Sequence, residues 1–211
     1  MLNLTERVAQ ALLEIDAVGF SPHSPIRFKS GILSPIYVDN RCLPFHPPQW
    51  RIVIEGFRAL IAEQGLTFDV VAGVAVGGVP HSAALAYTLG CPSVFVRKEA
   101  KEHGRGKQVE GGSLSGQRTL LVEDLVTTGG SSLAAVAALR AEDARVDAVV
   151  TIVSYGFAEA EQAFTAAGVR LYALTHLDAL ITQARALGKL SESDAAIVAH
   201  WYQNPHDWTP T

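Results

Sequence analysis

Apolar runs of strand length alternate with helical patterns through the middle of this chain, and the alternation limits what it can fold into. Such alternation indicates βαβ units, with a mostly parallel sheet and helices on both faces. Ligands of sheets of this kind bind beyond the carboxyl ends of the strands. The predicted strands are Val70–Val74, Ser93–Val96, Thr119–Val122, Ala148–Val153 and Arg170–Leu174, and the predicted helices between them are Trp50–Glu63, His81–Leu89, Leu133–Arg140 and Ala158–Ala166.

The composition is that of a folded domain rather than a disordered chain. The chain has 211 residues, of which 48% are apolar, and this length suits a single domain over residues 1–211. Basic residues number 17 and acidic residues 21, for a net charge of −4, which disfavours nucleic acid as a partner. The two cysteines, Cys42 and Cys91, are too few for a disulfide framework, so a reducing, cytoplasmic compartment is expected.

Residues 70–96 carry no Asp, Glu, Lys or Arg, which raises the question of a membrane span. Glycines such as Gly77 and Gly78 break the stretch into strand, turn and helix, so a buried parallel sheet explains it better and no membrane partner is expected. The N-terminus is not a signal peptide, because charged residues interrupt any apolar core there. Asn3 and Glu6 instead have the spacing of a capping box, which predicts that a helix begins there.

The segment from Leu120 to Ser132 predicts a phosphate-binding turn. It combines a buried strand, an acid pair, a turn rich in hydroxyls and glycines, and a helix expected to begin near Ser132. Glycine backbone can approach a ligand closely, and the helix directs its positive dipole end to the same place. Glu123 and Asp124 would repel a phosphate but suit sugar hydroxyls, or a cation that accompanies polyphosphate. The pattern therefore favours a phosphorylated sugar as ligand, and the alternative is a corner whose acids are merely solvated.

A second glycine-rich segment, Gly73–Gly78, matches no nucleotide motif. Val79 stands where a P-loop would have its lysine, and Ala75 replaces the second glycine of a dinucleotide fingerprint, so both readings are disfavoured. His81, which follows this turn, is interpreted as a local cap or a packing residue.

Residues 98–117 form a long charged segment with five glycines and no apolar periodicity. Loops of this length in a compact domain are usually functional lids or disordered. Beside a phosphate turn we favour a mobile lid over a merely solvated loop, because a diphosphate leaving group needs cations and a lid excludes water. The cations gathered there are Arg97, Lys98, Lys101, His103, Arg105 and Lys107.

The two ends of the chain lie outside the alternating pattern. Residues 20–48 are rich in proline and have little periodicity, whereas Leu177–Trp201 has a helical pattern. We expect the two ends, about 1–48 and 175–211, to pack together as a small cap over the sheet edge.

The Glu123–Ser131 turn resembles the ribose 5-phosphate signature of the type I phosphoribosyltransferases. Together with Phe28–Tyr37 and Arg97–Gly104, in that order, it makes the chain similar to the orotate phosphoribosyltransferases. The resemblance implies a type I phosphoribosyltransferase fold and a pentosyl transfer in UMP biosynthesis, from 5-phosphoribosyl 1-diphosphate and orotate to orotidine 5′-monophosphate and diphosphate. It also implies Mg²⁺, held mainly by the substrate diphosphate and water, and a homodimer in which each lid reaches the partner's site.

The same resemblance implies a role for individual residues. The catalytic ones are Lys29, Lys101, His103 and Asp124, of which Lys29 reaches both diphosphate and base. By position, the resemblance assigns the 5′-phosphate to Thr127, Thr128, Gly129, Gly130 and Ser131, with Leu125 and Val126 completing the binding segment, and it assigns the ribose hydroxyls to Glu123 and Asp124. It assigns the diphosphate to Arg97, Lys98, Lys101 and His103. It assigns the base to Lys29 and to the backbone of Tyr37 and Val38.

The chain departs from the family pattern at one place. Many members carry an Asp-Arg pair after the strand that follows the phosphate turn, and that arginine holds the orotate carboxylate. Here the corresponding stretch is Ile152-Val153-Ser154-Tyr155-Gly156, which has no arginine, so the carboxylate partner is unassigned. Two alternatives are a phosphoribosyltransferase for another base, which the Lys29–Tyr37 segment disfavours, and a regulator that senses 5-phosphoribosyl 1-diphosphate, which would need an added nucleic-acid-binding part or a basic face.

Overall fold

A six-stranded sheet forms the centre of the computed structural model, which describes residues 2–28, 30–99 and 108–210. The strand order is β10-β9-β8-β5-β6-β7, and all neighbours are parallel except β6 and β7. Its strands are β5 Val70–Val74, β6 Ser93–Val96, β7 Val109–Glu110, β8 Thr119–Val126, β9 Ala148–Ser154 and β10 Arg170–His176.

The predicted strands are confirmed, but β8 is longer than the sequence suggested. We expected it to end at Val122, before the acid pair. The structure continues it to Val126, because Leu125 and Val126 pair with Val153 and Ser154 of β9. The two acids therefore lie within the strand, and their positions are set by the sheet rather than by a loop.

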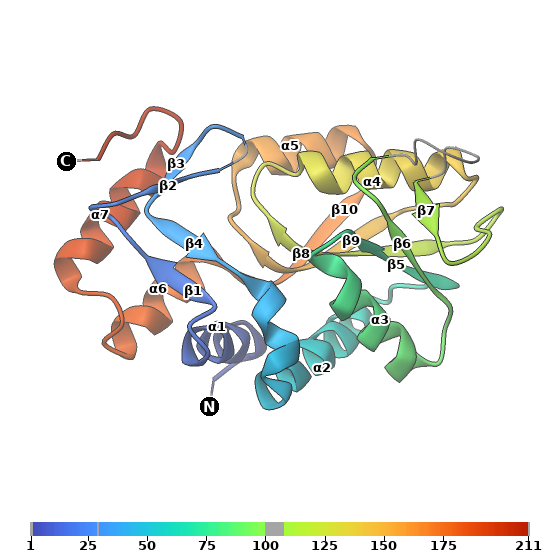
Figure 1. The fold of residues 1–211 in the computed structure, drawn as a ribbon, viewed down its shortest axis with the longest axis horizontal. Helices are drawn as coiled ribbons and strands as arrows, with labels where there is room; N and C mark the ends of the chain where they lie inside the picture. The colour runs from blue at the N-terminus through green and yellow to red at the C-terminus, as the bar shows by residue number, and fades with distance from the viewer. Residues whose placement is uncertain (1, 29, 100–107, 211) are drawn as a thin grey trace.

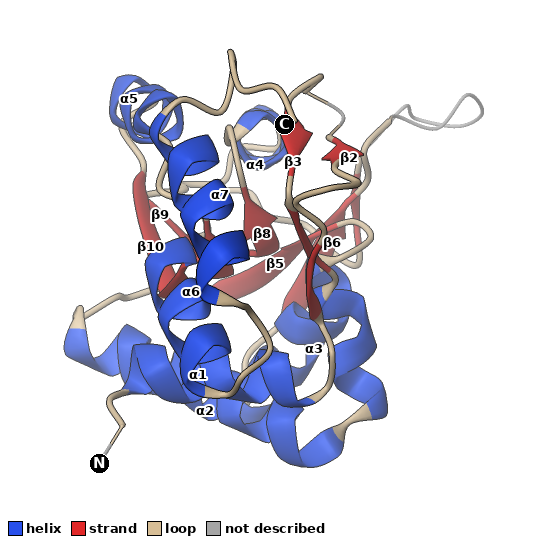
Figure 2. Cartoon of the chain, turned by 90° about the vertical axis from the view of Figure 1, so that its left-hand side faces the viewer, coloured by secondary structure: helices blue, strands red, loops and turns tan. Residues whose placement is uncertain are grey.

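Helices cover both faces of the sheet, as the alternation predicted. Figure 2 shows α4 and α5 on one side of the sheet and α1, α2 and α3 on the other. Three helices begin earlier than expected: α4 at Gly130 rather than near Ser132, α3 at Gly78 rather than His81, and α2 at Pro47 rather than Trp50. The helices are α1 Leu4–Glu14, α2 Pro47–Glu63, α3 Gly78–Leu89, α4 Gly130–Ala141, α5 Ala158–Ala166, α6 Leu177–Ala186 and α7 Glu192–Gln203.

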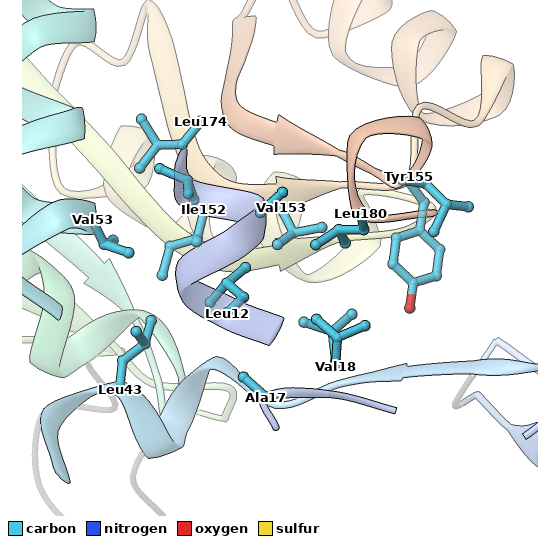
Figure 3. Close-up of a cluster of buried hydrophobic side chains, with 14 of the residues drawn as sticks. Leu12, Ala17, Val18, Leu43, Val53, Ile152, Val153, Tyr155, Leu174 and Leu180 are labelled. Atoms are coloured by element: carbon cyan, nitrogen blue, oxygen red, sulfur yellow. The ribbon is translucent and has the colours of Figure 1, made fainter. Parts of the chain in front are cut away.

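Each face of the sheet buries its own apolar cluster. The smaller one lies under α4 and α5 and includes Leu139 and Phe164. The larger one lies under α1 to α3 and joins the sheet to both ends of the chain. Figure 3 shows Leu12 of α1 in this cluster among Ile152, Val153 and Val18.

The proline-rich N-terminal region has more regular structure than its sequence indicated. It forms two short antiparallel hairpins, β1 with β4 and β2 with β3, followed by a 3₁₀ helix, η1. These elements are β1 Val18–Phe20, β2 Ile26–Arg27, β3 Leu33–Ser34, β4 Ile36–Val38 and η1 Asn40–Phe45.

The two ends of the chain contact each other beside the edge strand β10. Figure 1 shows both hairpins next to α6 and α7. Lys189 Nζ donates to the Leu13 carbonyl at 2.7 Å, and Trp201 Nε1 donates to the Leu33 carbonyl at 2.7 Å. The N-terminal capping box is also present, because Asn3 and Glu6 exchange hydrogen bonds.

Among the described residues, no helix is both long and apolar enough to cross a membrane. Cys42 and Cys91 are free thiols.

Candidate active site

The candidate site lies where β8, β5 and β6 end. These strands are neighbours and parallel, so their carboxyl ends open on one edge of the sheet (Figure 1). β8 leads into the hydroxyl-rich turn, β5 into the glycine pair Gly77-Gly78, and β6 into Arg97 and Lys98. The fold thus brings together segments that are far apart in the sequence.

The turn after β8 presents free hydrogen-bond donors. Gly129 adopts φ +83° there, in the left-handed region that glycine tolerates, and it precedes α4 without a side-chain cap. The hydroxyls of Thr127, Thr128 and Ser131 bond to no other described residue. An uncapped helix N-terminus surrounded by hydroxyls is suited to an anion such as phosphate.

The acid pair splits into a buried and a half-buried member. Glu123 is only 4% exposed. Its carboxylate accepts hydrogen bonds from Ser132 Oγ and from the Asp124 amide, both at 3.1 Å. Burial, and then the neighbouring Asp124 carboxyl, raise the pKa of Glu123 well above its usual range. Asp124 is therefore the acid better placed to meet a ligand as a carboxylate.

The glycines after β5 make room for this acid. A Cβ on Gly77 would collide with the Asp124 carboxyl group, and one on Gly78 would lie 2.5 Å from the Val122 carbonyl. Side chains at either position would push β8 and its acid away. Gly77 and Gly78 thus serve close packing against β8, whereas Gly129 combines its positive φ with packing against the Phe164 ring.

The segment expected to lie along the base forms strand β4. Tyr37 pairs with Gly19 of β1, and the bond from the Asp39 amide to the Ala17 carbonyl fixes the phase of the ladder. Because bonded pairs alternate in an antiparallel ladder, the peptide N–H and C=O of Val38 point away from β1. Tyr37 is 44% exposed, whereas Val38 is only 7% exposed.

A local ion pair flanks this strand and was not singled out from the sequence. Arg41 Nε donates to Asp39 at 2.6 Å, and Arg41 Nη2 donates to the Tyr37 hydroxyl at 3.0 Å. Hydrogen bonding from Arg41 lowers the pKa of Asp39. A spacing of two residues on an exposed turn gave no signal of this contact.

The predicted diphosphate cations are only partly described. Arg97 follows β6 and pairs with Glu110 at 3.7 Å, and Lys98 next to it is exposed. Both lie at the same sheet edge as the phosphate turn. Lys29, Lys101 and His103 lie outside the described residues.

Leu125 and Val126 lie in the last part of β8. Leu125 is half-buried, whereas the Val126 side chain is 1% exposed and faces the core. The Val126 carbonyl accepts the Tyr155 amide at 2.9 Å. Val126 can therefore contact a ligand only through backbone atoms, because its side chain is buried and its carbonyl is bonded to Tyr155.

In the stretch where many family members carry the arginine, Tyr155 packs into the apolar core. Tyr155 is fully buried, with its ring 5.6 Å from that of Phe28 and 6.1 Å from that of Trp201. Its hydroxyl has no hydrogen-bond partner among the described residues.

His81 is a packing residue, and the alternative that it caps α3 is wrong. Gly77 occupies the N-cap, and His81 is fully buried inside the helix. Its Nδ1 accepts the Trp50 Nε1 proton at 3.0 Å. Burial lowers the pKa of His81 to about 4, against the opposing pull of Asp124.

Two buried side chains that support the acid pair escaped the sequence analysis, Asn40 and Ser132. Asn40 Nδ2 donates to the Asp124 carbonyl at 2.7 Å across 84 positions of sequence. Ser132 was seen only as a helix residue, although its hydroxyl reaches Glu123. A sequence does not display burial or such distant contacts, so neither carried a signal.

The described residues hold no group of three or more His, Cys, Asp or Glu side chains that could bind a metal ion. A crevice lined by Arg118, Arg145 and Arg170 lies at the amino ends of the strands. It is therefore at the opposite end of the sheet from the phosphate turn and is no part of this site.

Comparison with known proteins agrees with this geometry. The Phosphoribosyl transferase domain family matches residues 46–164. An orotate phosphoribosyltransferase of Coxiella burnetii is 42% identical over 209 residues, which cover 99% of this chain and 100% of that protein. The crystal structure of orotate phosphoribosyltransferase from Aeropyrum pernix is 30% identical and superposes with a TM-score of 0.75 over 87% of this chain and 99% of that one.

A third comparison carries a ligand. Orotate phosphoribosyltransferase from Mycobacterium tuberculosis H37Rv, solved in complex with 5-phospho-alpha-D-ribosyl 1-diphosphate, is 29% identical with a TM-score of 0.65, over 83% of this chain and 98% of that one. The expected type I phosphoribosyltransferase fold is confirmed. With relatives of this identity along its whole length, the chain belongs to the orotate phosphoribosyltransferase family.

Proposed function

We propose that this chain transfers the 5-phosphoribosyl group of 5-phosphoribosyl 1-diphosphate to N1 of orotate, in the synthesis of UMP. The C1–O bond to diphosphate breaks, a C1–N1 bond forms, and orotate loses its N1 proton. The observation that carries the proposal is the turn after β8, where hydroxyls that bond to no described residue and an uncapped helix N-terminus adjoin an acid pair. A phosphorylated sugar needs both halves of that arrangement.

Phosphate recognition rests on Thr127 to Ser131. Three free hydroxyls and the first amides of α4 supply neutral donors, and the helix dipole adds a favourable field. The relative from M. tuberculosis that was solved with 5-phospho-alpha-D-ribosyl 1-diphosphate supports the same ligand here.

Asp124 is our proposed partner of the ribose hydroxyls. Its carboxylate is half-buried beside Gly77, whereas Glu123 is turned inward and held by Ser132. A carboxylate here also opposes the positive charge that develops on the sugar as the C1–O bond breaks. Glu123 then acts mainly by keeping its neighbour's backbone in place.

The diphosphate needs cations. Arg97 and Lys98 at the end of β6 supply two, and we assign the same role to Lys101, His103 and Lys29, which lie outside the described residues. Mg²⁺ bound to the diphosphate would neutralise charge on the leaving group. Oxygens of the substrate diphosphate and water suit Mg²⁺ without a dedicated protein cage.

The base is proposed to lie along β4. The N–H and C=O of Val38 that point away from β1 offer one donor and one acceptor, a pattern that a pyrimidine with adjacent N–H and carbonyl groups can match. For the orotate carboxylate we keep Lys29 and nearby backbone amides as partners, because Tyr155 fills the place of the family arginine with core.

A homodimer with shared sites is part of this proposal. Phe45, Val76 and Tyr87 are exposed by 86%, 79% and 88%. They lie on η1, the turn after β5 and α3, and large apolar side chains of this kind are what a partner covers. Mixing Lys101→Ala with Asp124→Asn subunits should then restore part of the activity in hybrid dimers. No recovery despite proven subunit exchange would count against shared sites.

The direct test of the function is loss of orotate absorbance on adding 5-phosphoribosyl 1-diphosphate, with and without Mg²⁺. Orotate should be consumed and diphosphate released in equal amounts, and chelation of Mg²⁺ should stop the reaction. Replacing orotate with adenine, hypoxanthine or uracil controls for base preference. Turnover with one of these bases and none with orotate would overturn the proposal.

A further inference from the structure

Asn40 joins the base-side strand to the ribose acid. It follows β4 by two residues, is fully buried, and donates from Nδ2 to the main-chain carbonyl of Asp124 at 2.7 Å. Neither the predicted site nor the family comparison assigns it a role. A buried amide that spans two segments of one site is worth explaining, because burying polar atoms is costly unless they are bonded.

A second buried contact lies behind Asn40. Trp50 of α2 donates to His81 Nδ1 at 3.0 Å, so this ring nitrogen is an acceptor and the ring is neutral with its proton on Nε2. The backbone of Asn40 lies against the same ring. Figure 1 shows the chain passing from β4 to α2 beside α3, and η1 also touches β8. Among the described residues His81 Nε2 and Asn40 Oδ1 are both buried without a hydrogen-bond partner, so the bond from Asn40 Nδ2 to Asp124 is the direct link to the acid.

Asp124 is consequently fixed at both ends. Its carboxyl group is packed against Gly77, and its carbonyl is held by Asn40. Losing the Asn40 donor would leave the carboxylate in the site but free its backbone to shift. A positioning loss of this kind affects the reaction step more than initial binding of the 5′-phosphate.

We propose that Asn40 is a positioning residue that sets Asp124 relative to the base-side strand β4. This rests on the proposed function, since the ribose contact of Asp124 belongs to it. Asn40 itself touches no substrate in this scheme. Its effect reaches the reaction through the Asp124 backbone.

The sharpest variant is Asn40→Asp, which keeps the size of the side chain and replaces the donor by a titratable group. As a carboxylate it cannot donate to the Asp124 carbonyl, but as a carboxylic acid it can. Burial raises the pKa of such a group. The charged or titratable groups around it are His81 of α3, Glu123 and Asp124 of β8, and Asp39, Arg41 and Cys42 of its own segment.

The expected result is a pH-dependent rescue. In Asn40→Asp, kcat should be about tenfold below the wild type at alkaline pH and approach it as pH falls, and Asn40→Ala should be slow at every pH. The KM for 5-phosphoribosyl 1-diphosphate should stay within about threefold in both variants. The same ratio to wild type at every pH in Asn40→Asp would overturn the proposal.

Leu43→Ala is the matched control for a merely structural effect. Leu43 lies in the same 3₁₀ helix, is fully buried, and points into the apolar cluster (Figure 3). It should lower the melting temperature without changing kcat or the pH profile. If Leu43→Ala reproduces the kinetics of the Asn40 variants at equal stability, Asn40 is only structural.

Two further outcomes remain decisive. If Asn40→Asp does not fold, Asn40→Ser retains a short donor, and a kcat at least about threefold above that of Asn40→Ala supports positioning, whereas equal rates refute it. If the wild type itself does not consume orotate, the proposed function fails and not the inference alone.

Discussion

The turns after β5 and β8 have the same outline and different chemistry. Each links a buried strand to a helix through a pair of glycines, and each helix begins without a side-chain cap. After β8 the turn carries Thr127 and Thr128, and a Cβ on Gly130 would meet open space. After β5 the space beside each glycine is occupied by the neighbouring strand: the Asp124 carboxyl group lies beside Gly77, and the Val122 carbonyl lies beside Gly78.

The difference shows what glycine means in such a turn. At the β8 turn Gly130 leaves space for a ligand, whereas Gly129 packs against the Phe164 ring, 2.9 Å from where a Cβ would lie. At the β5 turn both glycines let the chain approach the neighbouring strand β8. In the sequence, both turns are a Gly-Gly pair before a helix, and only the hydroxyl-bearing residues of the β8 turn distinguish the two. Mutations at the two turns should therefore fail in different ways.

The largest effect is expected from Gly77→Ala. The new methyl group would collide with the Asp124 carboxyl group and displace the proposed ribose acid. We expect kcat/KM to fall about a hundredfold, because overpacking costs about 1–3 kcal/mol and each 1.4 kcal/mol is tenfold. Gly19→Ala is the control, since nothing lies within 4 Å of a Cβ there. Full activity of Gly77→Ala would show that the Asp124 position does not matter.

The β8 turn should respond through one substrate only. Thr128→Ala or Ser131→Ala removes a hydroxyl that bonds to no described residue. The KM for 5-phosphoribosyl 1-diphosphate should rise about tenfold with each, because a hydrogen bond to a charged group is worth about 1.5–3 kcal/mol. The KM for orotate should not change. Thr88→Ala, whose hydroxyl donates to the Leu85 carbonyl, controls for loss of a hydroxyl alone, and an equal rise there would refute the phosphate role.

The sheet and its helices could be predicted because their signals are local. The ranges Val70–Val74, Ser93–Val96 and Ala158–Ala166 match the structure at both ends. Buried strands are apolar throughout, and glycines mark where they stop. β8 was cut short because Glu123 and Asp124 are polar, although pairing with β9 holds them in the strand.

The support beneath the site could not be predicted for the same reason. Asn40 and His81 are polar residues in unremarkable positions, and their burial arises from contacts with segments remote in sequence. The hairpins of the N-terminal region also contact the C-terminal helices, which lie far away in the sequence, as the bond from Trp201 to Leu33 illustrates.

A smaller effect is expected on how stability depends on pH, and it comes from Glu123 of β8, just before the phosphate turn. The raised pKa of Glu123 means that the folded chain keeps a proton which the unfolded chain releases from about pH 4.3 upward. The unfolded state then binds fewer protons, so stability falls as pH rises from that value and stops falling above the raised pKa. Glu123→Gln should remove this slope in melting temperatures measured between about pH 4 and pH 8.

The control for this slope is Asp69, whose pKa is lowered to about 2 by hydrogen bonds from Arg118. Its contribution to stability has the opposite sign: it is present above the ordinary carboxyl pKa and lost as pH falls toward 2. Asp69→Asn should alter only the acidic side of the curve. An unchanged slope in Glu123→Gln would show that the buried carboxyl is ionised in the folded chain.

The smallest effect is expected at a third strand-to-helix turn, after β9. Here Tyr155 stands where many family members carry an arginine, and its hydroxyl is buried without a partner among the described residues. Removing such a hydroxyl relieves an unsatisfied group, so Tyr155→Phe should leave stability equal or raise it by up to about 1 kcal/mol. The KM for orotate should be unchanged, because the ring packs among Phe28, Phe157 and Trp201 rather than facing the site.

Tyr155→Ala, in contrast, should lower the free energy of unfolding by about 3–5 kcal/mol through the cavity it leaves. A several-fold rise in the orotate KM with Tyr155→Phe would mean that this turn, like the one after β8, presents its hydroxyl to a substrate. The turn after β9 would then count as a ligand-facing turn rather than a packed one.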